Sequence, residues 1–108
     1  MKLARAVGSY SASKAGRFLL AKTLARELGP CGIRSNAVGP GFIRRRLTEP
    51  FLADRQFMAK YFGDGPPLVP LGRIGKPEDV SGPALFLASR DAAFVNGALL
   101  LVDGGQLA

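Results

Sequence analysis

Tyr10-Ser11-Ala12-Ser13-Lys14-Ala15-Gly16 places a phenol and an ammonium group four residues apart. If this stretch is helical, the spacing is about one turn and both side chains project from one face. Tyrosine ionises near pH ~10, and lowering that value by about three units takes roughly 4 kcal/mol of preferential stabilisation of the phenolate. A cation about 4 Å away supplies about that much at an effective dielectric of ~20, but only about 1 kcal/mol in water. The pair therefore suits proton transfer in a water-poor cleft and is inert on a solvated helix face, and the spacing fits both.

Outward from this stretch, helical and extended patterns alternate. Gly29-Pro30 ends the first helical pattern, and there we expect glycine to permit a left-handed exit. Pro77 stands where a first helical residue belongs, whereas Pro83 in the same helix costs about 3 kcal/mol if unrelieved. The patterns predict helices over residues 10–28, 47–61 and 77–89, strands over 33–38 and 98–102, and a loop over 63–67. This order is that of the C-terminal part of a doubly wound parallel sheet, so we expect an α/β fold of Rossmann type that is incomplete.

Apolar side chains identify the surfaces that we expect to pack. The first helix carries a stripe with a period near 3.6 residues, formed by Ala12, Ala15, Leu19, Leu20, Leu24 and Leu28. Residues 98–102 are a continuous apolar run, which suits a strand buried on both faces. A third apolar face, suited to lining a pocket or to simple packing, consists of Phe51, Leu52, Phe57, Met58, Tyr61 and Phe62.

Composition excludes several classes of protein. The chain has 108 residues, no histidine and one cysteine, so a zinc or iron site is very improbable and a histidine-dependent triad is excluded. The lone Cys31 fits a reducing, cytoplasmic compartment. No apolar run approaches the roughly 18 residues of a membrane span, and residues 1–7 lack a signal-peptide core. The formal charge is +8 over residues 1–50 and −1 over residues 51–108. We interpret the basic half mainly as solvated surface, with a dinucleotide phosphate or non-specific nucleic acid as alternatives.

Several motifs in one order carry a resemblance to a known family. They are residues 10–16, the stretch Gly32-Ile33-Arg34-Ser35-Asn36-Ala37-Val38-Gly39-Pro40-Gly41, Pro70-Leu71-Gly72-Arg73, Pro77-Glu78-Asp79-Val80, Asn96-Gly97 and Val102-Asp103-Gly104-Gly105. From Gly8 onward the chain resembles the C-terminal part of a single-domain short-chain dehydrogenase/reductase. The resemblance implies that residues 1–108 are part of an NAD(P)-binding domain of Rossmann type. It also implies hydride transfer between NAD or NADP and a carbonyl or secondary alcohol.

The resemblance assigns roles to five residues. Tyr10 would exchange the proton on the substrate oxygen and would also contribute to cofactor binding. Lys14 would lower the pKa of Tyr10 and bind the ribose hydroxyls of the cofactor. Pro40 and Gly41 would form the loop that approaches the nicotinamide, with glycine allowing a close approach to the ring. The backbone of Ile43 would meet the carboxamide.

One departure stands close to this loop. Many members of the family carry a cofactor-facing threonine two residues after the position of Ile43, where this chain has Arg45 within Arg44-Arg45-Arg46. An arginine can pair with a diphosphate or lie in solvent, and Thr48 is the nearest substitute for the threonine. In the family, residues 47–67 would correspond to the segment that closes over substrate.

Other parts of the family pattern have no counterpart in the 108 residues. These are the glycine-rich fingerprint for the pyrophosphate, the catalytic serine and the asparagine. We therefore expect a fragment that is inactive alone. An alternative is a non-catalytic interaction module, because the helix over 10–28 and the last helix and strand resemble oligomer surfaces of the family. The expected partners are a small-molecule substrate and further copies or a full-length relative, with no membrane and no specific nucleic acid.

Overall fold

The computed structural model describes residues 8–62 and 68–108, apart from the side chains of residues 8–11, 60 and 61. The loop predicted over 63–67 lies outside these residues. The chain divides into two compact units. The first comprises residues 1–37 and 92–100, the second residues 38–91 and 101–108, and each is described by itself.

The first unit begins with helix α2, Gly8–Leu28, which confirms the helix predicted over 10–28. A 3₁₀ turn, Gly29–Cys31, follows it, with Pro30 near its start. The left-handed residue is Gly32, with φ 76°, so the prediction that Gly29 makes this exit was wrong. The backbone makes one 3₁₀ turn after α2 before the left-handed residue. Pro30 is compatible with this turn, because a proline in a first turn lacks an N–H that would need no partner there.

Only part of the predicted stripe on α2 is covered. Leu24 and Leu28 of this stripe are half-buried, whereas Leu19 and Leu20 are 62% and 55% exposed, and Ala12 and Ala15 are exposed as well. Ala21 and Ala25, which are buried, lie outside the predicted stripe. The residues that pack on α2 in this unit meet the C-terminal half of the helix, where the main chain at Gly97 approaches the Ala25 β-carbon. The prediction that this stripe packs was therefore wrong for the N-terminal half of the helix.

Two asparagines hold the next segment in place. The Asn36 Nδ2 donates to the Val95 carbonyl at 2.9 Å, and its Oδ1 accepts from the Ala98 N–H at 2.9 Å. The Asn96 Nδ2 donates to the Ala25 carbonyl at 3.0 Å, and its Oδ1 accepts from the Ser35 N–H at 2.9 Å. These side chains replace ladder hydrogen bonds ahead of the strand. The strand predicted over 33–38 is accordingly shorter and later, Ala37–Pro40 (β1).

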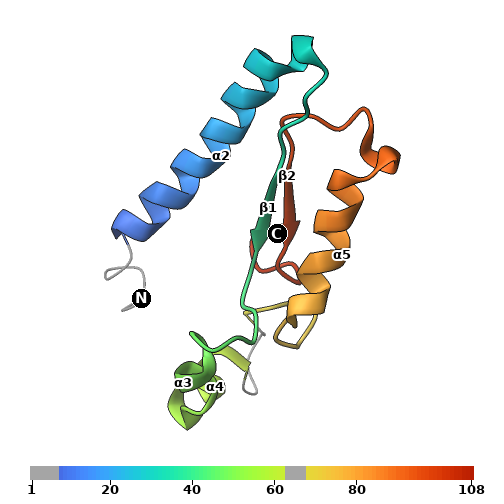
Figure 1. The fold of residues 1–108 in the computed structure, drawn as a ribbon. Helices are drawn as coiled ribbons and strands as arrows, with labels where there is room; N and C mark the ends of the chain where they lie inside the picture. The colour runs from blue at the N-terminus through green and yellow to red at the C-terminus, as the bar shows by residue number, and fades with distance from the viewer. Residues whose placement is uncertain (1–7, 63–67) are drawn as a thin grey trace. The chain divides into compact units, whose positions relative to one another are not determined.

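β1 pairs in parallel with β2, Leu99–Val102, which confirms the second predicted strand (Figure 1). Donation from the Ala37 N–H to the Ala98 carbonyl and from the Gly41 N–H to the Val102 carbonyl fixes the register. Pro40 costs no bond to β2, because alternate residues of a strand donate to opposite sides. Leu99 and Leu101 are alternate residues of β2 and share one face, and they are 38% and 45% exposed. The described residues do not cover this face, so the prediction that the strand is buried on both faces was wrong.

The described residues of the second unit include three α-helices. In place of one helix over 47–61 there are two, α3, Glu49–Leu52, and α4, Arg55–Phe62. The interruption is Asp54, whose Oδ1 accepts from the Gln56 and Phe57 N–H groups at 2.9 and 3.2 Å and so caps α4.

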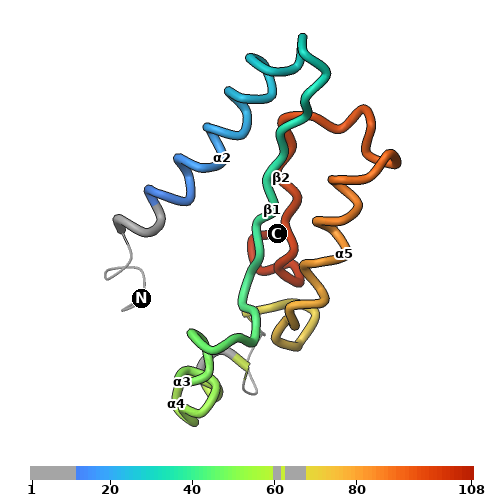
Figure 2. The backbone as a smooth tube through the Cα atoms, viewed as in Figure 1, coloured from blue at the N-terminus to red at the C-terminus, as the bar shows by residue number. Residues whose placement is uncertain are grey.

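The third helix, α5, Pro77–Ala88, confirms the helix predicted over 77–89. Pro83 lies inside this helix, and Leu87 is its buried side chain. The backbone of α5 is drawn as a continuous coil in Figure 2. Within the described ranges, no helix has the length and apolar character needed to cross a bilayer. The two parallel strands and their connecting helices confirm the α/β class and the incomplete parallel sheet.

Candidate active site

Tyr10 and Lys14 both lie in α2, which confirms their helical spacing of about one turn. The Lys14 side chain is exposed, and the Tyr10 side chain lies outside the described side chains. The two residues belong to the first unit, whereas Pro40, Gly41 and Ile43 belong to the second.

Ile43 is the best anchored residue of the loop that follows β1. It is buried and forms a parallel bridge with Gly75. The Arg44 N–H donates to the Gly75 carbonyl at 2.8 Å, and the Gly75 N–H donates to the Phe42 carbonyl at 2.9 Å. In a parallel bridge of this pattern, the N–H and carbonyl of Ile43 point away from Gly75.

On that opposite side, the Ile43 carbonyl accepts from the Thr48 Oγ1 at 2.7 Å. The Ile43 N–H has no hydrogen-bond acceptor among the described residues. A buried main-chain N–H without an acceptor is rare in proteins, and each such group calls for an explanation such as a ligand.

Thr48 supports the loop from within. Its Oγ1 accepts from the Arg45 N–H at 2.9 Å and lies 2.9 Å from the Arg45 carbonyl. The Thr48 hydroxyl is thus engaged with the main chain of residues 43–45. The structure shows it as a local brace, which differs from the cofactor-facing role of the family threonine.

Gly41 is required for a reason that the sequence did not indicate. A β-carbon at position 41 would lie 2.6 Å from the Cβ and 2.7 Å from the Cα of Asp103. Asp103 is itself held by its own turn, since its Oδ1 accepts from the Gly105 N–H at 2.9 Å and its Oδ2 from the Leu107 N–H at 3.0 Å. The glycine therefore admits Asp103 beside the loop, and Asp103 is a site residue that sequence reasoning missed. Its signal was the Asp-Gly-Gly sequence at residues 103–105.

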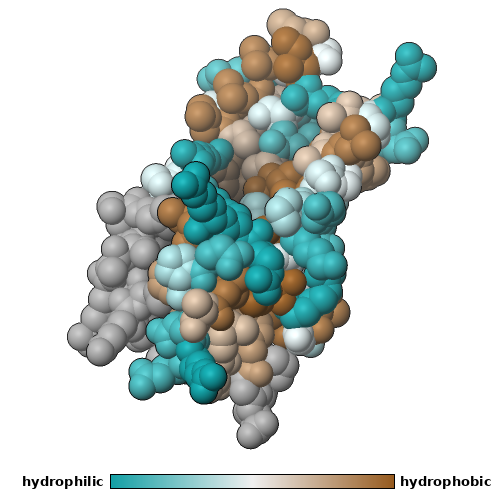
Figure 3. Space-filling view, turned by 60° about the horizontal axis from the view of Figure 1, so that its bottom comes forward, coloured by the Kyte–Doolittle hydropathy of each residue, from teal (hydrophilic) through white to brown (hydrophobic). Residues whose placement is uncertain are grey.

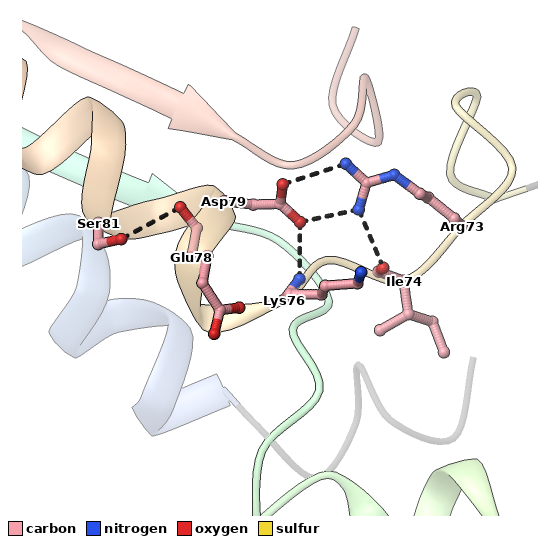
Figure 4. Close-up of polar contacts among 6 residues, drawn as sticks. All are labelled: Arg73, Ile74, Lys76, Glu78, Asp79 and Ser81. Atoms are coloured by element: carbon pink, nitrogen blue, oxygen red, sulfur yellow. Dashed lines mark hydrogen bonds and ion pairs between the residues drawn. The ribbon is translucent and has the colours of Figure 1, made fainter.

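Arg73 and Asp79, which flank Gly75 in the sequence, form an ion pair (Figure 4). Arg73 Nη1 and Nη2 donate to Asp79 Oδ2 and Oδ1 at 2.8 and 3.1 Å, and Asp79 Oδ2 also accepts from the Lys76 N–H at 2.7 Å. The hydrogen bonds from Arg73 and from the Lys76 N–H lower the pKa of Asp79 to about 2. Arg73 and Asp79 lie in two motifs that sequence analysis noted without assigning a function, and together they fix the turn that carries Gly75.

The second unit contains a hollow of about 540 Å³. Ile43, Gly75 and Asp103 line it together with apolar side chains such as Val69 and Leu101. Of the predicted site residues of this unit, Ile43 lines the hollow, whereas Pro40 and Gly41 do not. No cluster of metal-ligating side chains occurs in the part of the chain that the structure describes.

Beyond the loop, aromatic rings pack on one another. Phe57 contacts Phe42 and Phe51, each with ring centroids 5.4 Å apart, and Phe42 also contacts Phe62 at 6.3 Å. The apolar face predicted over 47–62 therefore packs on the first residue after Gly41. The sequence between Phe42 and Phe51 contains three exposed arginines, residues 44–46. The first of them, Arg44, forms an ion pair with Glu49 at 3.7 Å.

Known proteins share this sequence and arrangement. A family model described as enoyl-(acyl carrier protein) reductase matches residues 2–106. An L-rhamnose-1-dehydrogenase of Scheffersomyces stipitis is 49% identical over 96 residues, which are 89% of this chain and 36% of that protein. Among solved structures, an Agrobacterium tumefaciens protein provisionally assigned as a 2-deoxy-D-gluconate 3-dehydrogenase, with bound NADP, matches with a TM-score of 0.84 and 42% identity over 92% of this chain and 39% of its own. A short-chain type dehydrogenase/reductase of Mycobacterium ulcerans matches with a TM-score of 0.84 and 36% identity over 93% and 35%.

The chain therefore belongs to the short-chain dehydrogenase/reductase family, and its fold is of Rossmann type. It spans little more than a third of the length of the relatives that it matches.

Proposed function

We propose that this chain supplies the proton-transfer pair and the nicotinamide-facing loop of an NAD(P)-dependent oxidoreductase. The reaction is hydride transfer between the cofactor and a carbonyl or secondary alcohol. The observation that carries the proposal is the N–H of buried Ile43, which has no acceptor among the described residues and lies in a segment held by Gly75 and Thr48. Family membership and the NADP bound by the Agrobacterium neighbour support it.

The residues of the loop fit a nicotinamide cofactor, NAD or NADP. The Ile43 N–H would donate to the carboxamide oxygen, and Pro40 and Gly41 would present backbone without bulky side chains. A β-carbon at position 41 would overlap Asp103, and one at position 75 would require the terminal methyl group of Ile43 to move. Lys14 would hold the ribose hydroxyls. When bound, the cofactor supplies or takes up the hydride.

Tyr10 and Lys14 provide the proton chemistry. In the direction of reduction, the Tyr10 hydroxyl gives its proton to the oxygen that develops negative charge, and in oxidation the phenolate takes it back. The Lys14 ammonium, one helical turn away, favours the phenolate electrostatically. We assign Tyr10 and Lys14 to the proton transfer and Pro40, Gly41 and Ile43 to the cofactor, within an NAD(P)-binding domain of which residues 1–108 are a part.

Association with further copies of this chain or with a relative is part of the proposal. Exposed apolar side chains, Leu19, Leu20, Leu99 and Leu101 among them, favour it, and hydrophobic residues are exposed on the face shown in Figure 3. The exposed thiol of Cys31 suits a reducing compartment, so we assign the protein to the cytoplasm. The substrate is a small molecule.

The test is a chimera in which this chain replaces the matched region of the Scheffersomyces stipitis relative. The chimera is assayed for reduction of NAD and NADP with L-rhamnose, D-gluconate and simple secondary alcohols. We expect turnover with at least one alcohol. A chimera that folds and binds the cofactor but turns over none of them would contradict the proposed function.

A further inference from the structure

The main chain of Arg45 is held through both its N–H and its carbonyl. Its N–H donates to the Thr48 Oγ1 at 2.9 Å, and its carbonyl accepts from the Thr48 and Glu49 N–H groups at 2.9 and 3.0 Å. The main chain at position 45 is therefore fixed relative to Ile43. Two residues span at most about 7 Å, so the Arg45 Cα lies close to the Ile43 N–H.

The charge of Arg45 is not used within the described residues. Arg44 has Glu49 as its ion-pair partner, whereas Arg45 and Arg46 are exposed and have no carboxylate partner in the described part of the chain. A guanidinium can form two parallel hydrogen bonds to a carboxylate.

We propose that Arg45 is a specificity-determining residue that binds a carboxylate group of the substrate. This inference rests on the proposed function, because it places the substrate beside the nicotinamide-facing N–H of Ile43. The substrate class that follows is a hydroxy acid or keto acid. Arg45 leads directly into α3 and α4, so its side chain and the aromatic rings would contact the same molecule.

The test compares D-gluconate with its uncharged amide, D-gluconamide, as substrates of the chimera and three variants. Arg45→Gln should raise the KM for D-gluconate about ten- to hundredfold, the effect of one charge-assisted hydrogen-bonded pair, and leave the KM for D-gluconamide unchanged. Arg45→Lys should recover only part of the affinity, because it keeps the charge and loses the paired donors. Arg46→Gln removes the same charge from the next residue and should have little effect.

Calorimetric titration of D-gluconate into the Tyr10→Phe chimera gives an equilibrium measurement without turnover. Arg45→Gln should weaken this binding by the same factor, also at about 0.15 M salt, where long-range attraction is largely screened. Equal effects of Arg45→Gln and Arg46→Gln, an equal loss for the amide, or a rise in the KM for NAD(P) alone would overturn the inference. In each of these outcomes the chimera still transfers hydride, so the proposed function stands.

Discussion

Gly41 and Asp103 approach each other so closely that no side chain fits between them, since a β-carbon on residue 41 would lie 2.6 Å from the Asp103 Cβ. The two residues come from the segments that follow β1 and β2. Their contact fixes where the loop toward Ile43 leaves the sheet, and it places the C-terminal turn of the chain in direct support of the candidate site.

Gly41→Ala should therefore destabilise the protein. Forcing a methyl group into a filled contact costs about 1–3 kcal/mol. Gly16→Ala in α2 is the matched control, because nothing lies within 4 Å of the added β-carbon. Alanine in a helix interior should stabilise by about 0.5–1 kcal/mol. Urea unfolding of both chimera variants measures the difference, and equal stability of the two would contradict the contact.

The ion pair of Arg73 and Asp79 predicts a pH dependence of stability. The pKa of Asp79 is lowered from 3.8 to about 2 by the hydrogen bonds from Arg73 and the Lys76 N–H. Because the folded state favours the ionised carboxylate, the ion pair stabilises the folded protein. This contribution to the free energy of unfolding is complete above about pH 4 and is lost as the pH falls toward 2. Asp79→Asn should thus be less stable than the parent above pH 4, and the gap should narrow between pH 4 and 2. Thermal melts across this range measure it, and a constant gap would refute the assignment.

Asn36 should contribute more to the stability of the fold than an ordinary surface residue does. Asn36→Ala removes one bond to the Val95 carbonyl and one from the Ala98 N–H, at a cost of about 1–3 kcal/mol. Asn36→Asp keeps the acceptor for the Ala98 N–H and loses the donor to the Val95 carbonyl. The stability of this variant should therefore lie between that of the parent and that of Asn36→Ala. Ser81→Ala, which removes an exposed hydroxyl bonded to the Glu78 carbonyl, is the control and should change stability by less than about 0.5 kcal/mol. A loss for Asn36→Ala as small as that of the control would contradict the brace.

The sequence predicted the elements whose signals are local. The apolar period and the Gly29-Pro30 stop indicated α2, and Pro77 with the acidic residues after it indicated α5. The first strand was misplaced because side chains of Asn36 and Asn96 satisfy the main chain before it, using partners from a distant segment. The break between α3 and α4 depends on which local bonds the Asp54 carboxylate makes.

The same distinction holds for the site. The spacing of Tyr10 and Lys14 and the Pro-Gly loop could be recognised as motifs. The close approach of Asp103 to Gly41 and the bridge of Ile43 to Gly75 could not, because each joins segments that are remote in the sequence. The role of Thr48 was left open since an exposed hydroxyl and a bracing hydroxyl look alike in sequence.

The most direct test of the central claim is the turnover of the Tyr10→Phe chimera. If Tyr10 exchanges the proton, kcat should fall about 10²–10⁴-fold, the usual contribution of a general acid or base. The dissociation constant for NAD(P) should stay unchanged in this variant. Lys14→Ala should impair both quantities, because Lys14 acts on the phenolate and on the ribose. A Tyr10→Phe chimera with the turnover of its parent would contradict the account.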